Sequence, residues 1–420
     1  MLDIKYIRDH QQQCTTELAK RGVAPAVVKK LLSLDEVRRE TIASIEKLKA
    51  KKNEFNKSIG QLSAAQKNEK IEEMAALTRQ QKKFQDQLEA TASTMQSVLS
   101  DLPNLPANDV KVGKDETENE IIKTIGEKTS FTFSPKDYME IALLHDLIDT
   151  RRAAKVSGSR FGYLKGDGAL LWSALVQYAM DILLKEKFIP FYSPSLIKRD
   201  AMENSGYDSY TDGQDAYYIE KDDLFLVGTG EHALLPYHSG EVLPESDLPL
   251  RYTTYSSCYR REAGSYGKDT KGILRVHQFD KQEMVVLTTP EKSWDTFDWL
   301  VGIQEQIISG LELPYHLLAV CTGDLPKPSA KVIDLECWLP SDGAYRETHS
   351  ASNCTDYQAR RNAIRYKGNN GAAQFVHILN ATGITPRTLI ALLENHQQAD
   401  GSVSIPKALR AYMRGATAVK

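Results

Sequence analysis

The sequence predicts an α+β protein in which an antiparallel sheet flanked by helices follows an N-terminal antiparallel helical coiled-coil arm. Residues 26–102 contain no proline and a single glycine, which is the composition of long helices. Beyond them, strand-like segments follow one another without intervening helices, which is typical of an antiparallel sheet. The length of 420 residues exceeds what one hydrophobic core usually fills, so more than one domain is expected.

The helical segment carries the repeat of a coiled coil. Its second half has an unbroken 3-4 spacing of seam positions, and its first half has the same spacing with weaker apolar occupancy. We expect a hairpin over about residues 26–100 that turns near Ser58–Ala65 and is roughly 50 Å long. The seam positions are Leu34, Arg38, Thr41, Ile45, Leu48, Lys52, Phe55 and Ile59, then Met74, Leu77, Gln81, Phe84, Leu88, Thr91, Met95 and Val98.

Charge is distributed unevenly along the chain. The formal net charge of −3 does not by itself indicate a nucleic-acid partner. Residues 26–102 nevertheless carry 14 basic against 11 acidic side chains, and the first helix holds the excess, including Lys49, Lys51 and Lys52. These cations are consistent either with a solvated helix face or with a surface that contacts nucleic-acid phosphates.

The first domain boundary is predicted at Leu102–Pro106, where two prolines break the helix. The expected domains are therefore residues 1–105 and 106–420. In the second domain, helical patterns are expected at Tyr138–Asp149 and Gly168–Glu186, and strands at Leu224–Val227, Tyr252–Tyr259, Ile273–Leu287, Lys331–Leu339 and Tyr345–His349.

Several classes of protein are disfavoured by composition. No apolar run approaches the ~20 residues of a membrane span, and the N-terminus lacks signal-peptide and transit-peptide features, so we expect a cytoplasmic protein. The five cysteines form no C-x-x-C pair, so neither a disulfide framework nor a zinc site is expected. Glycine-rich Rossmann and P-loop signatures are missing as well.

The residues with most chemical character lie between Cys258 and Leu287, where two strand-like runs flank a polar loop. If residues 274–286 form a strand, alternation places basic, aromatic and acidic side chains on one face. On the preceding strand, Arg260 and Glu262 also share a face. A surface hairpin with salt bridges is the alternative to a functional site. The shared face of the second strand holds Arg275, His277, Phe279, Lys281 and Glu283.

This segment resembles motif 2 of class II aminoacyl-tRNA synthetases, in the form typical of seryl-tRNA synthetases. Other elements of that family follow in order along nearly the whole chain. KFIPFYSPSLI, with Pro194, resembles the dimer-forming motif 1, and GTGEHAL supplies Thr229 and Glu231 as a T-x-E pair. Residues 345–361 resemble the segment with ATP and metal contacts, and residues 379–413 resemble motif 3 with Arg387. The coiled-coil arm is the family's tRNA-binding feature.

The resemblance implies roles that adenylate chemistry requires, because positioning and charge neutralisation are what a protein contributes to it. Arg260 would bridge the serine carboxylate and the α-phosphate, and Arg275 and Arg387 would hold the β- and γ-phosphates. Arg260 and Arg387 are the implied catalytic residues. Phe279 would stack on adenine against Arg387, and Glu262 would contact the adenine amino group. His277 either acts here or is a hydrogen-bonded structural histidine.

The resemblance also implies two sets of ligand contacts and one metal site. Glu347 and Ser350 would bind Mg²⁺ through oxygen, as this hard ion prefers. For Asn380 a helix-capping role is the alternative to a pocket role. The implied serine contacts are Thr229, Gly230, Glu231, Arg260, Glu283, Asn380 and Thr382. The implied ATP contacts are Arg260, Arg261, Glu262, Arg275, Val276, Phe279, Glu347, Thr348, His349, Ser350 and Arg387.

The implied function is activation of L-serine with ATP to seryl-adenylate and pyrophosphate, followed by transfer of serine to the 3′ end of tRNA(Ser). A homodimer is implied, with tRNA(Sec) as a further candidate acceptor. A paralogue that no longer charges tRNA and a catalytically dead scaffold are the competing hypotheses. Two features depart from the family pattern. The loop at 203–210 differs but is expected to touch no assigned catalytic residue, and Gly230 is expected to alter loop flexibility more than specificity.

Overall fold

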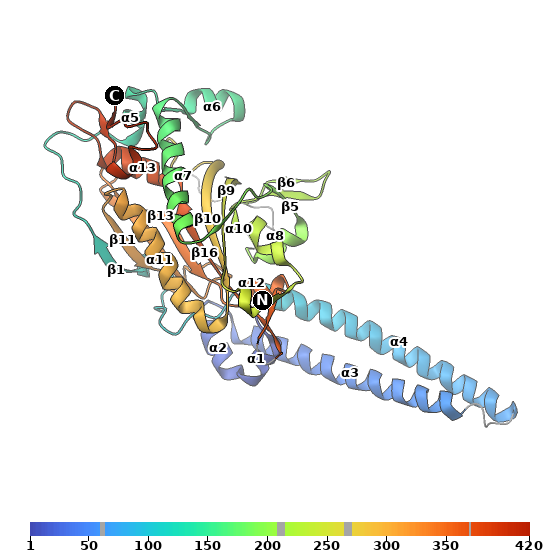
Figure 1. Cartoon of the computed structure of the whole chain (residues 1–420). Helices are drawn as coiled ribbons and strands as arrows, with labels where there is room; N and C mark the ends of the chain where they lie inside the picture. Colours follow the sequence, from blue (N-terminus) through green and yellow to red (C-terminus); the bar gives the residue numbers. More distant parts are fainter. Residues whose placement is uncertain (59–63, 208–214, 264–270, 369–370) are drawn as a thin grey trace. The chain divides into compact units, whose positions relative to one another are not determined.

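The computed structural model describes residues 1–58, 64–207, 215–263, 271–368 and 371–420 (Figure 1). The chain divides into two compact units, Met1–Leu105 and Pro106–Lys420. Each unit is built around its own set of elements. Within the described residues, no helix is both long enough and apolar enough to cross a membrane.

The N-terminal unit consists of two short helices followed by two long ones that run side by side (Figure 1). The short helices are α1 (Ile4–Asp9) and α2 (Gln11–Ala19), and the long ones are α3 (Pro25–Ser58) and α4 (Ala64–Asp101). Proline suits the first position of α3 because the amide that it lacks would have no partner inside the helix. The predicted turn falls mostly on residues 59–63, which lie outside the described residues, as does Ile59 of the seam.

The predicted seam matches the burial of the two long helices. From Met74 to Val98 each seam residue is buried or half-buried, whereas most residues between them are exposed. On α3, Thr41, Ile45 and Leu48 are fully buried. The predicted coiled coil is therefore confirmed. Two polar seam residues also meet across it, because Lys52 Nζ donates a hydrogen bond to Gln81 Oε1 at 2.9 Å.

The C-terminal unit is built on an eight-stranded sheet in the order β1-β11-β12-β13-β16-β10-β9-β4. All neighbouring strands are antiparallel except β4 and β9, so the predicted α+β class is confirmed. The strands are β1 (Glu120–Ile125), β4 (Ile189–Phe191), β9 (Leu250–Tyr259), β10 (Gln278–Thr288), β11 (Tyr315–Ala319), β12 (Lys331–Leu339), β13 (Ala344–Asn353) and β16 (His377–Ile384).

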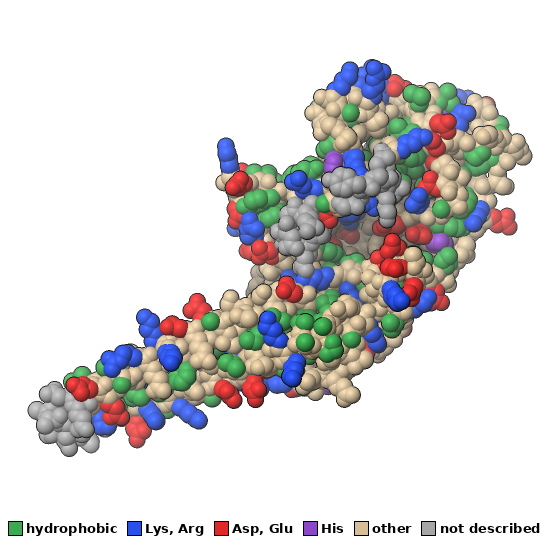
Figure 2. Space-filling model, turned by 180° about the vertical axis from the view of Figure 1, so that it is seen from behind, with side chains coloured by type: hydrophobic (Ala, Val, Ile, Leu, Met, Phe, Trp, Pro, Cys, Tyr) green, Lys and Arg blue, Asp and Glu red, His purple; other side chains and the backbone are tan. Residues whose placement is uncertain are grey.

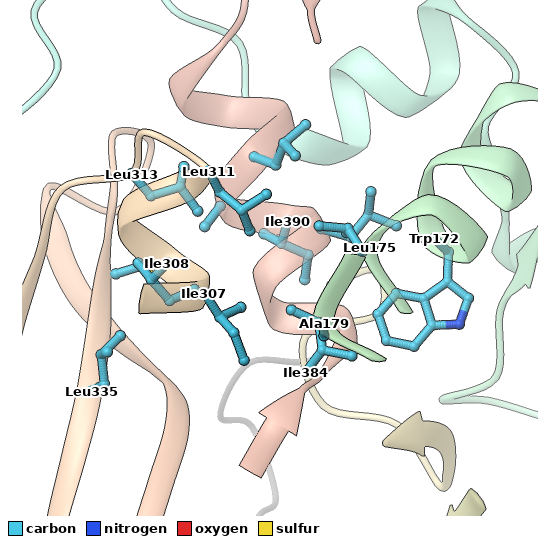
Figure 3. Close-up of a cluster of buried hydrophobic side chains, with 14 of the residues drawn as sticks. Trp172, Leu175, Ala179, Ile307, Ile308, Leu311, Leu313, Leu335, Ile384 and Ile390 are labelled. Atoms are coloured by element: carbon cyan, nitrogen blue, oxygen red, sulfur yellow. The ribbon is translucent and has the colours of Figure 1, made fainter. Parts of the chain in front are cut away.

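Helices pack on both faces of this sheet: α7 (Asp167–Lys185), α11 (Ser293–Gly310) and α13 (Pro386–Asn395) on one, and α10 (Glu231–Leu234) and α12 (Tyr357–Arg361) on the other. The remaining helices of this unit are α5 (Tyr138–Leu144), α6 (Thr150–Ser157) and α8 (Arg199–Ser205). Figure 3 shows Leu175 of α7, Ile308 of α11 and Ile390 of α13 converging over Leu335 and Ile384 of the sheet. Burial of each such side chain contributes about 1.5–3 kcal/mol to the stability of the fold, so this cluster holds the three helices against one face of the sheet.

Strand β10 has both faces covered, and this determines which side chains can reach a site. Met284 and Val286 pack into the cluster shared with α7, α11 and α13, whereas Val285 and Leu287 belong to a second cluster on the opposite face. Because side chains alternate along a strand, the odd-numbered residues, including Glu283, point to that opposite face.

The predicted strand at 273–287 is wrong at its start, because β10 begins at Gln278. The preceding segment is held in turns: Gly272 has a φ of +69°, and Tyr138 Oη accepts a hydrogen bond from the Ile273 amide at 2.9 Å. Arg275 and His277 are therefore not on the same strand face as Phe279. The predicted helix at 138–149 is also too long, since α5 ends at Leu144.

Candidate active site

A cavity of about 240 Å³ lies where β10, β13 and β16 meet α10 and the start of α13. Most of the residues predicted to contact serine, ATP or Mg²⁺ line this cavity. They are Thr229, Glu231, Arg260, Glu262, Arg275, Val276, Phe279, Glu283, Glu347, Thr348, Ser350, Asn380, Thr382 and Arg387. The structure thus brings segments more than 150 residues apart in sequence into one site.

The predicted contacts outside the cavity lining are Gly230, Arg261 and His349. Arg261 lies over the ring of Tyr217, with 5.7 Å from the guanidinium carbon to the ring centre. His349 is buried and its Nε2 lies 3.1 Å from the carbonyl oxygen of Gly383. Burial lowers the pKa of His349 to about 4, so its imidazole is neutral at pH 7. Arg261 and His349 therefore lie outside the cavity lining, each in contact with another part of the protein.

Strand β10 supplies the floor of the cavity through Phe279, Lys281 and Glu283, which alternate onto one face. The guanidinium of Arg260 lies over the Phe279 ring at 5.1 Å, and Arg260 Nε donates to the Gly228 carbonyl at 3.2 Å. A planar cation and an aromatic ring thus line the same part of the cavity.

Two buried carboxylates lie at the end of the cavity nearest α10. Glu231 accepts hydrogen bonds from Gln358 Nε2 at 2.6 Å and from Tyr207 Oη at 3.4 Å. Glu283 accepts one from Thr229 Oγ1 at 3.2 Å and pairs with Lys281. The side chains of Glu231 and Glu283 are only 3% and 2% exposed. An organic cation with a hydroxyl group would find both an anion and hydrogen-bond acceptors here.

Burial acts in opposite directions on the pKa of Glu231 and on the pKa of Lys281, the cation beside Glu283. Burial and then the charge of Glu283 raise the pKa of Glu231 to about 7. Burial lowers the pKa of Lys281, but the adjacent Glu283 outweighs this effect and the pKa is raised overall. Lys281 is therefore charged at pH 7, whereas Glu231 is close to its midpoint of titration.

Two further arginines that line the cavity are held by carboxylates. Arg275 Nη1 donates to Glu262 Oε2 at 2.8 Å, and Arg387 Nη1 donates to Glu347 Oε2 at 3.0 Å. Partial desolvation raises the pKa of Glu347, whose side chain is still 49% exposed, but Arg387 outweighs this effect and lowers the pKa overall. Both ion pairs keep guanidinium groups extended at the cavity edge, where they can meet an anionic ligand.

A β-bulge in β13 places two oxygen donors on the same side. The pairing with β12 shifts between Leu335 and Glu336, so that Glu336 lies opposite Glu347 and Asp334 lies opposite Ser350. Strict alternation would send residues 347 and 350 to opposite faces, whereas the bulge lets both line the cavity. Burial, followed by Glu347, raises the pKa of Asp334 well above its usual value.

Three of the alternatives left open by the sequence can be compared with the structure. Asn380 lies in the middle of β16, so the helix-capping interpretation is wrong. His277 Nδ1 lies 3.0 Å from the carbonyl oxygen of Arg260, outside the cavity lining, as expected of a structural histidine. The described part of the loop at 203–210 does contact one predicted serine-binding residue, because Tyr207 Oη donates to Glu231, which is not one of the two implied catalytic arginines. Residues 208–210 of that loop lie outside the described residues.

Gly230 has a steric role that differs from the predicted effect on loop flexibility. Its φ of −60° is open to any residue, so backbone freedom does not require glycine here. A Cβ at this position would lie 2.4 Å from Thr254 Cγ2 and 3.1 Å from Ser256 Oγ. Thr254 is held in place by Ser193, whose hydroxyl lies 2.9 Å from Thr254 Oγ1. Glycine is required because side chains of β9 lie directly against it.

Comparison with known proteins agrees with both units. The family "Seryl-tRNA synthetase N-terminal domain" matches residues 1–106, and "tRNA synthetase class II core domain (G, H, P, S and T)" matches residues 217–396. A serine–tRNA ligase of Pseudothermotoga lettingae is 42% identical over 419 residues, which cover 98% of this chain and 99% of the relative.

The chain belongs to the serine–tRNA ligase family.

Solved structures of the family share the whole fold. A Pyrococcus horikoshii seryl-tRNA synthetase complexed with ATP superposes with a TM-score of 0.95 at 36% identity, covering 100% of this chain and 99% of that one. A cytoplasmic serine–tRNA ligase of Naegleria fowleri in complex with AMP gives 0.90 at 31% identity, with coverage of 100% and 99%. The predicted family, its class II synthetase fold and its ligase class are therefore confirmed.

Family membership does not name every residue of this site. Tyr207 and Gln358, which hold Glu231, received no role from the sequence, and neither did Lys281 or Asp334. Alternation along β10 did place Lys281 on the strand face that lines the cavity, so its position could be predicted from the sequence. The partners of Glu231 come from α12 and from the end of α8, and no spacing along the chain relates these segments to Glu231.

Proposed function

We propose that this chain activates L-serine with ATP, forming seryl-adenylate and pyrophosphate, and transfers the seryl group to the 3′ end of tRNA(Ser). The observation that carries the proposal is the pairing of Glu231 and Glu283 at one end of a cavity that holds Arg260, Arg275 and Arg387. Serine offers an ammonium, a hydroxyl and a carboxylate within a few ångströms. The cavity offers two buried anions at one end and guanidinium groups beyond them.

The serine contacts are assigned by charge. Both hydrogen-bond partners of Glu231 are neutral, so this carboxylate is proposed to bind the ammonium group. Glu283 already has a cation and is proposed to accept the hydroxyl, together with Thr382, which lies opposite it on β16. Thr229 and Asn380 complete the polar lining. Alanine would leave these buried groups unsatisfied, which disfavours its binding.

The phosphate contacts follow from the arginines. For adenylate formation the serine carboxylate attacks the α-phosphate in line, and charge accumulates on the phosphate oxygens. Arg260 lies over Phe279 and lines the same cavity as the carboxylate pair, so it is proposed to contact both reacting groups while Phe279 stacks on adenine. Arg275 and Arg387 are proposed to bind the β- and γ-phosphates. The related structures with ATP and AMP support a nucleotide in this cavity.

Magnesium is proposed to bind through Glu347 and Ser350. The described residues contain no cluster of three or more His, Cys, Asp or Glu side chains arranged to hold a metal. Mg²⁺ usually binds one or two protein oxygens and takes its remaining ligands from water and phosphates, so the two donors beside the bulge fit it. When bound, the ion would neutralise charge on the phosphates, while Arg387 supplies the protein's own charge at the same place.

The N-terminal unit, residues 1–105, is proposed to bind tRNA(Ser), and residues 106–420 to hold the chemistry. Figure 2 shows Lys and Arg side chains interspersed with acidic ones along the hairpin, and the basic excess of its first long helix supports phosphate contacts without base readout. Lys49 and Lys51 are exposed, whereas Lys52 is half-buried in the seam. We therefore assign most of the phosphate contact to Lys49 and Lys51. tRNA(Sec) is proposed as a second acceptor.

A homodimer is proposed to form through the segment that resembles motif 1. Strand β4 is an edge strand of the large sheet, and the loop after it exposes Tyr192 to 96%. Ile189 and Leu196 on either side are also exposed. An edge strand with exposed apolar side chains is normally covered by another surface, and a second copy would cover it. The protein is proposed to act in the cytoplasm.

The test is ATP–pyrophosphate exchange with a panel of amino acids, followed by charging of total tRNA and of separate tRNA(Ser) and tRNA(Sec) transcripts. Serine should support exchange about 10⁴-fold better than alanine, because a site built for a hydroxyl rejects the analogue that lacks it. Exchange without charging would indicate a paralogue that does not act on tRNA. Neither activity would indicate a scaffold, and either result would contradict the proposal.

A further inference from the structure

Lys281 is a buried cation of the site for which the proposed chemistry has no use. It lies on β10 two residues before Glu283, on the same strand face, and is only 8% exposed. Its Nζ contacts Glu283 Oε2, the same oxygen that accepts the hydrogen bond from Thr229. Among the described residues no side chain donates to Oε1 of Glu283. One oxygen of this carboxylate is thus occupied, and the other is available to the cavity.

Glu231, the second carboxylate, lacks a comparable cation. Within the described part of the chain it forms no ion pair, and both its donors, Tyr207 and Gln358, are neutral. Its charge is nevertheless affected by Lys281, which lowers the pKa of Glu231 against the larger effects of burial and Glu283. The lysine therefore acts on one glutamate by contact and on the other through space.

We propose that Lys281 is a positioning residue that divides two roles between the glutamates. By pairing with Oε2 it holds the Glu283 carboxylate in one orientation, with Oε1 directed at the substrate hydroxyl. Glu231 is then the one carboxylate of the two that gains a cation when the substrate ammonium binds. This inference rests on the proposed serine activation and deepens it, because it assigns the selection of a hydroxylated amino acid to a residue that does not touch the substrate.

The charge balance around the pair explains why a lysine is needed. Two buried carboxylates without a cation cannot both stay ionised, so one would hold a proton. The nearby titratable groups do not replace Lys281. His232 is neutral because burial lowers its pKa to about 3, and burial raises the pKa of the Cys258 thiol. Tyr207, Lys281 and Cys354 interact with Glu231, and Cys258 interacts with Glu283. His232 and Arg260 interact with Lys281.

The experiment compares Lys281→Met and Lys281→Arg with the wild type in pyrophosphate exchange between pH 6 and 8.5. Lys331→Met is the matched control, because Lys331 pairs with Asp109 away from the cavity. Lys281→Met should raise the KM for serine about 10- to 100-fold at pH 7 and leave the KM for ATP within about twofold. The preference for serine over alanine should fall about tenfold or more.

The pH profile separates positioning from a structural role. Without Lys281 the pKa of Glu231 rises, so the pH above which serine binds well should move upward and the KM defect should shrink toward pH 8.5. Lys281→Arg keeps the charge and should retain the wild-type profile. A defect in kcat alone, a defect in the KM for ATP, or a KM defect independent of pH would overturn the proposal.

Two controls keep the result interpretable. If Lys281→Met does not fold, judged by its thermal unfolding, Lys281→Arg decides alone: a folded arginine variant with an upward-shifted profile would contradict the proposal. Failure of the wild type to exchange pyrophosphate with serine would refute the proposed function itself. That outcome is read before any variant is measured.

Discussion

The helical hairpin is specified by a local repeat in the sequence, whereas the active-site cavity is specified by contacts between segments that are distant in the sequence. In the hairpin, each layer of the seam repeats the one before it, and the contacts between α3 and α4 follow directly from the 3-4 spacing. In the cavity, Thr229, Arg260, Glu283, Glu347 and Arg387 each come from a different segment, and contacts between distant parts of the chain bring them together. Changes to the cavity should therefore affect adenylate formation, whereas changes to the hairpin surface should affect only events that need tRNA.

The largest effect is expected from Arg260→Ala. This change removes the proposed charge partner of the reacting carboxylate and phosphate, so serine-dependent pyrophosphate exchange should fall by about 10²-fold or more. Arg199→Ala is the control, because Arg199 pairs with exposed Asp223 outside the cavity. Exchange at the wild-type rate in the Arg260 variant would remove Arg260 from the mechanism.

Gly230→Ala should have the next largest effect. The new Cβ would meet Thr254 Cγ2 at 2.4 Å, and overpacking of this kind costs about 1–3 kcal/mol, which corresponds to roughly 5- to 150-fold in kcat/KM for serine. Thr254→Ser deletes the offending methyl group and keeps the hydroxyl that meets Ser193, so the double variant should recover most activity.

The control for this pair is Gly302→Ala, since a Cβ on Gly302 in α11 meets open space. It should be neutral or slightly stabilising in thermal unfolding. If Thr254→Ser fails to rescue Gly230→Ala, glycine is needed for a reason other than the contact with Thr254.

A smaller effect, a rise in the KM for serine that approaches about tenfold per pH unit, is expected below pH 7. Burial and Glu283 raise the pKa of Glu231 to about 7, so this carboxylate becomes protonated as the pH falls below 7. Serine must then displace a proton, and its KM should rise as pH decreases from 7 to 6 and stay nearly constant from 7.5 to 8.5. Glu231→Gln should bind serine weakly at all these values, without the inflection. An unchanged inflection in that variant would assign the titration to another group.

The smallest effects are expected on the surface of the hairpin. Lys49→Gln with Lys51→Gln should lower tRNA charging a few-fold and flatten its salt dependence, because each lost phosphate contact reduces the salt slope by roughly 0.7–0.9. Lys52→Met should instead remove the hydrogen bond to Gln81 and destabilise the hairpin by about 0.5–1.5 kcal/mol. Equal salt slopes for the two sets of variants would contradict this division.

The sequence was most informative where structure is local or periodic. The seam residues from Met74 to Val98 and strand β12 lie where the spacing and the apolar pattern predicted them. The motif residues also came together as the family resemblance implied, because the resemblance carries the sheet register that composition does not.

Predictions failed where a distant contact decided the outcome. The segment before Gln278 looked like a strand but is held in turns by Tyr138, a residue more than 130 positions away. Thr254 beneath Gly230 and Tyr207 beside Glu231 likewise belong to other elements. The bulge that turns both Glu347 and Ser350 toward the cavity has no signature in the spacing of the strand itself.

The most direct test of this account is to delete Leu34–Val98, replace it with a short linker, and measure both reactions on the same preparation. The account predicts serine-dependent pyrophosphate exchange close to that of the full chain, because every residue of the cavity lies in the unit Pro106–Lys420. It also predicts loss of most tRNA(Ser) charging. Charging by the deleted chain with unchanged kcat/KM would contradict the assignment of the hairpin to tRNA, and loss of exchange would contradict the separation of the two units.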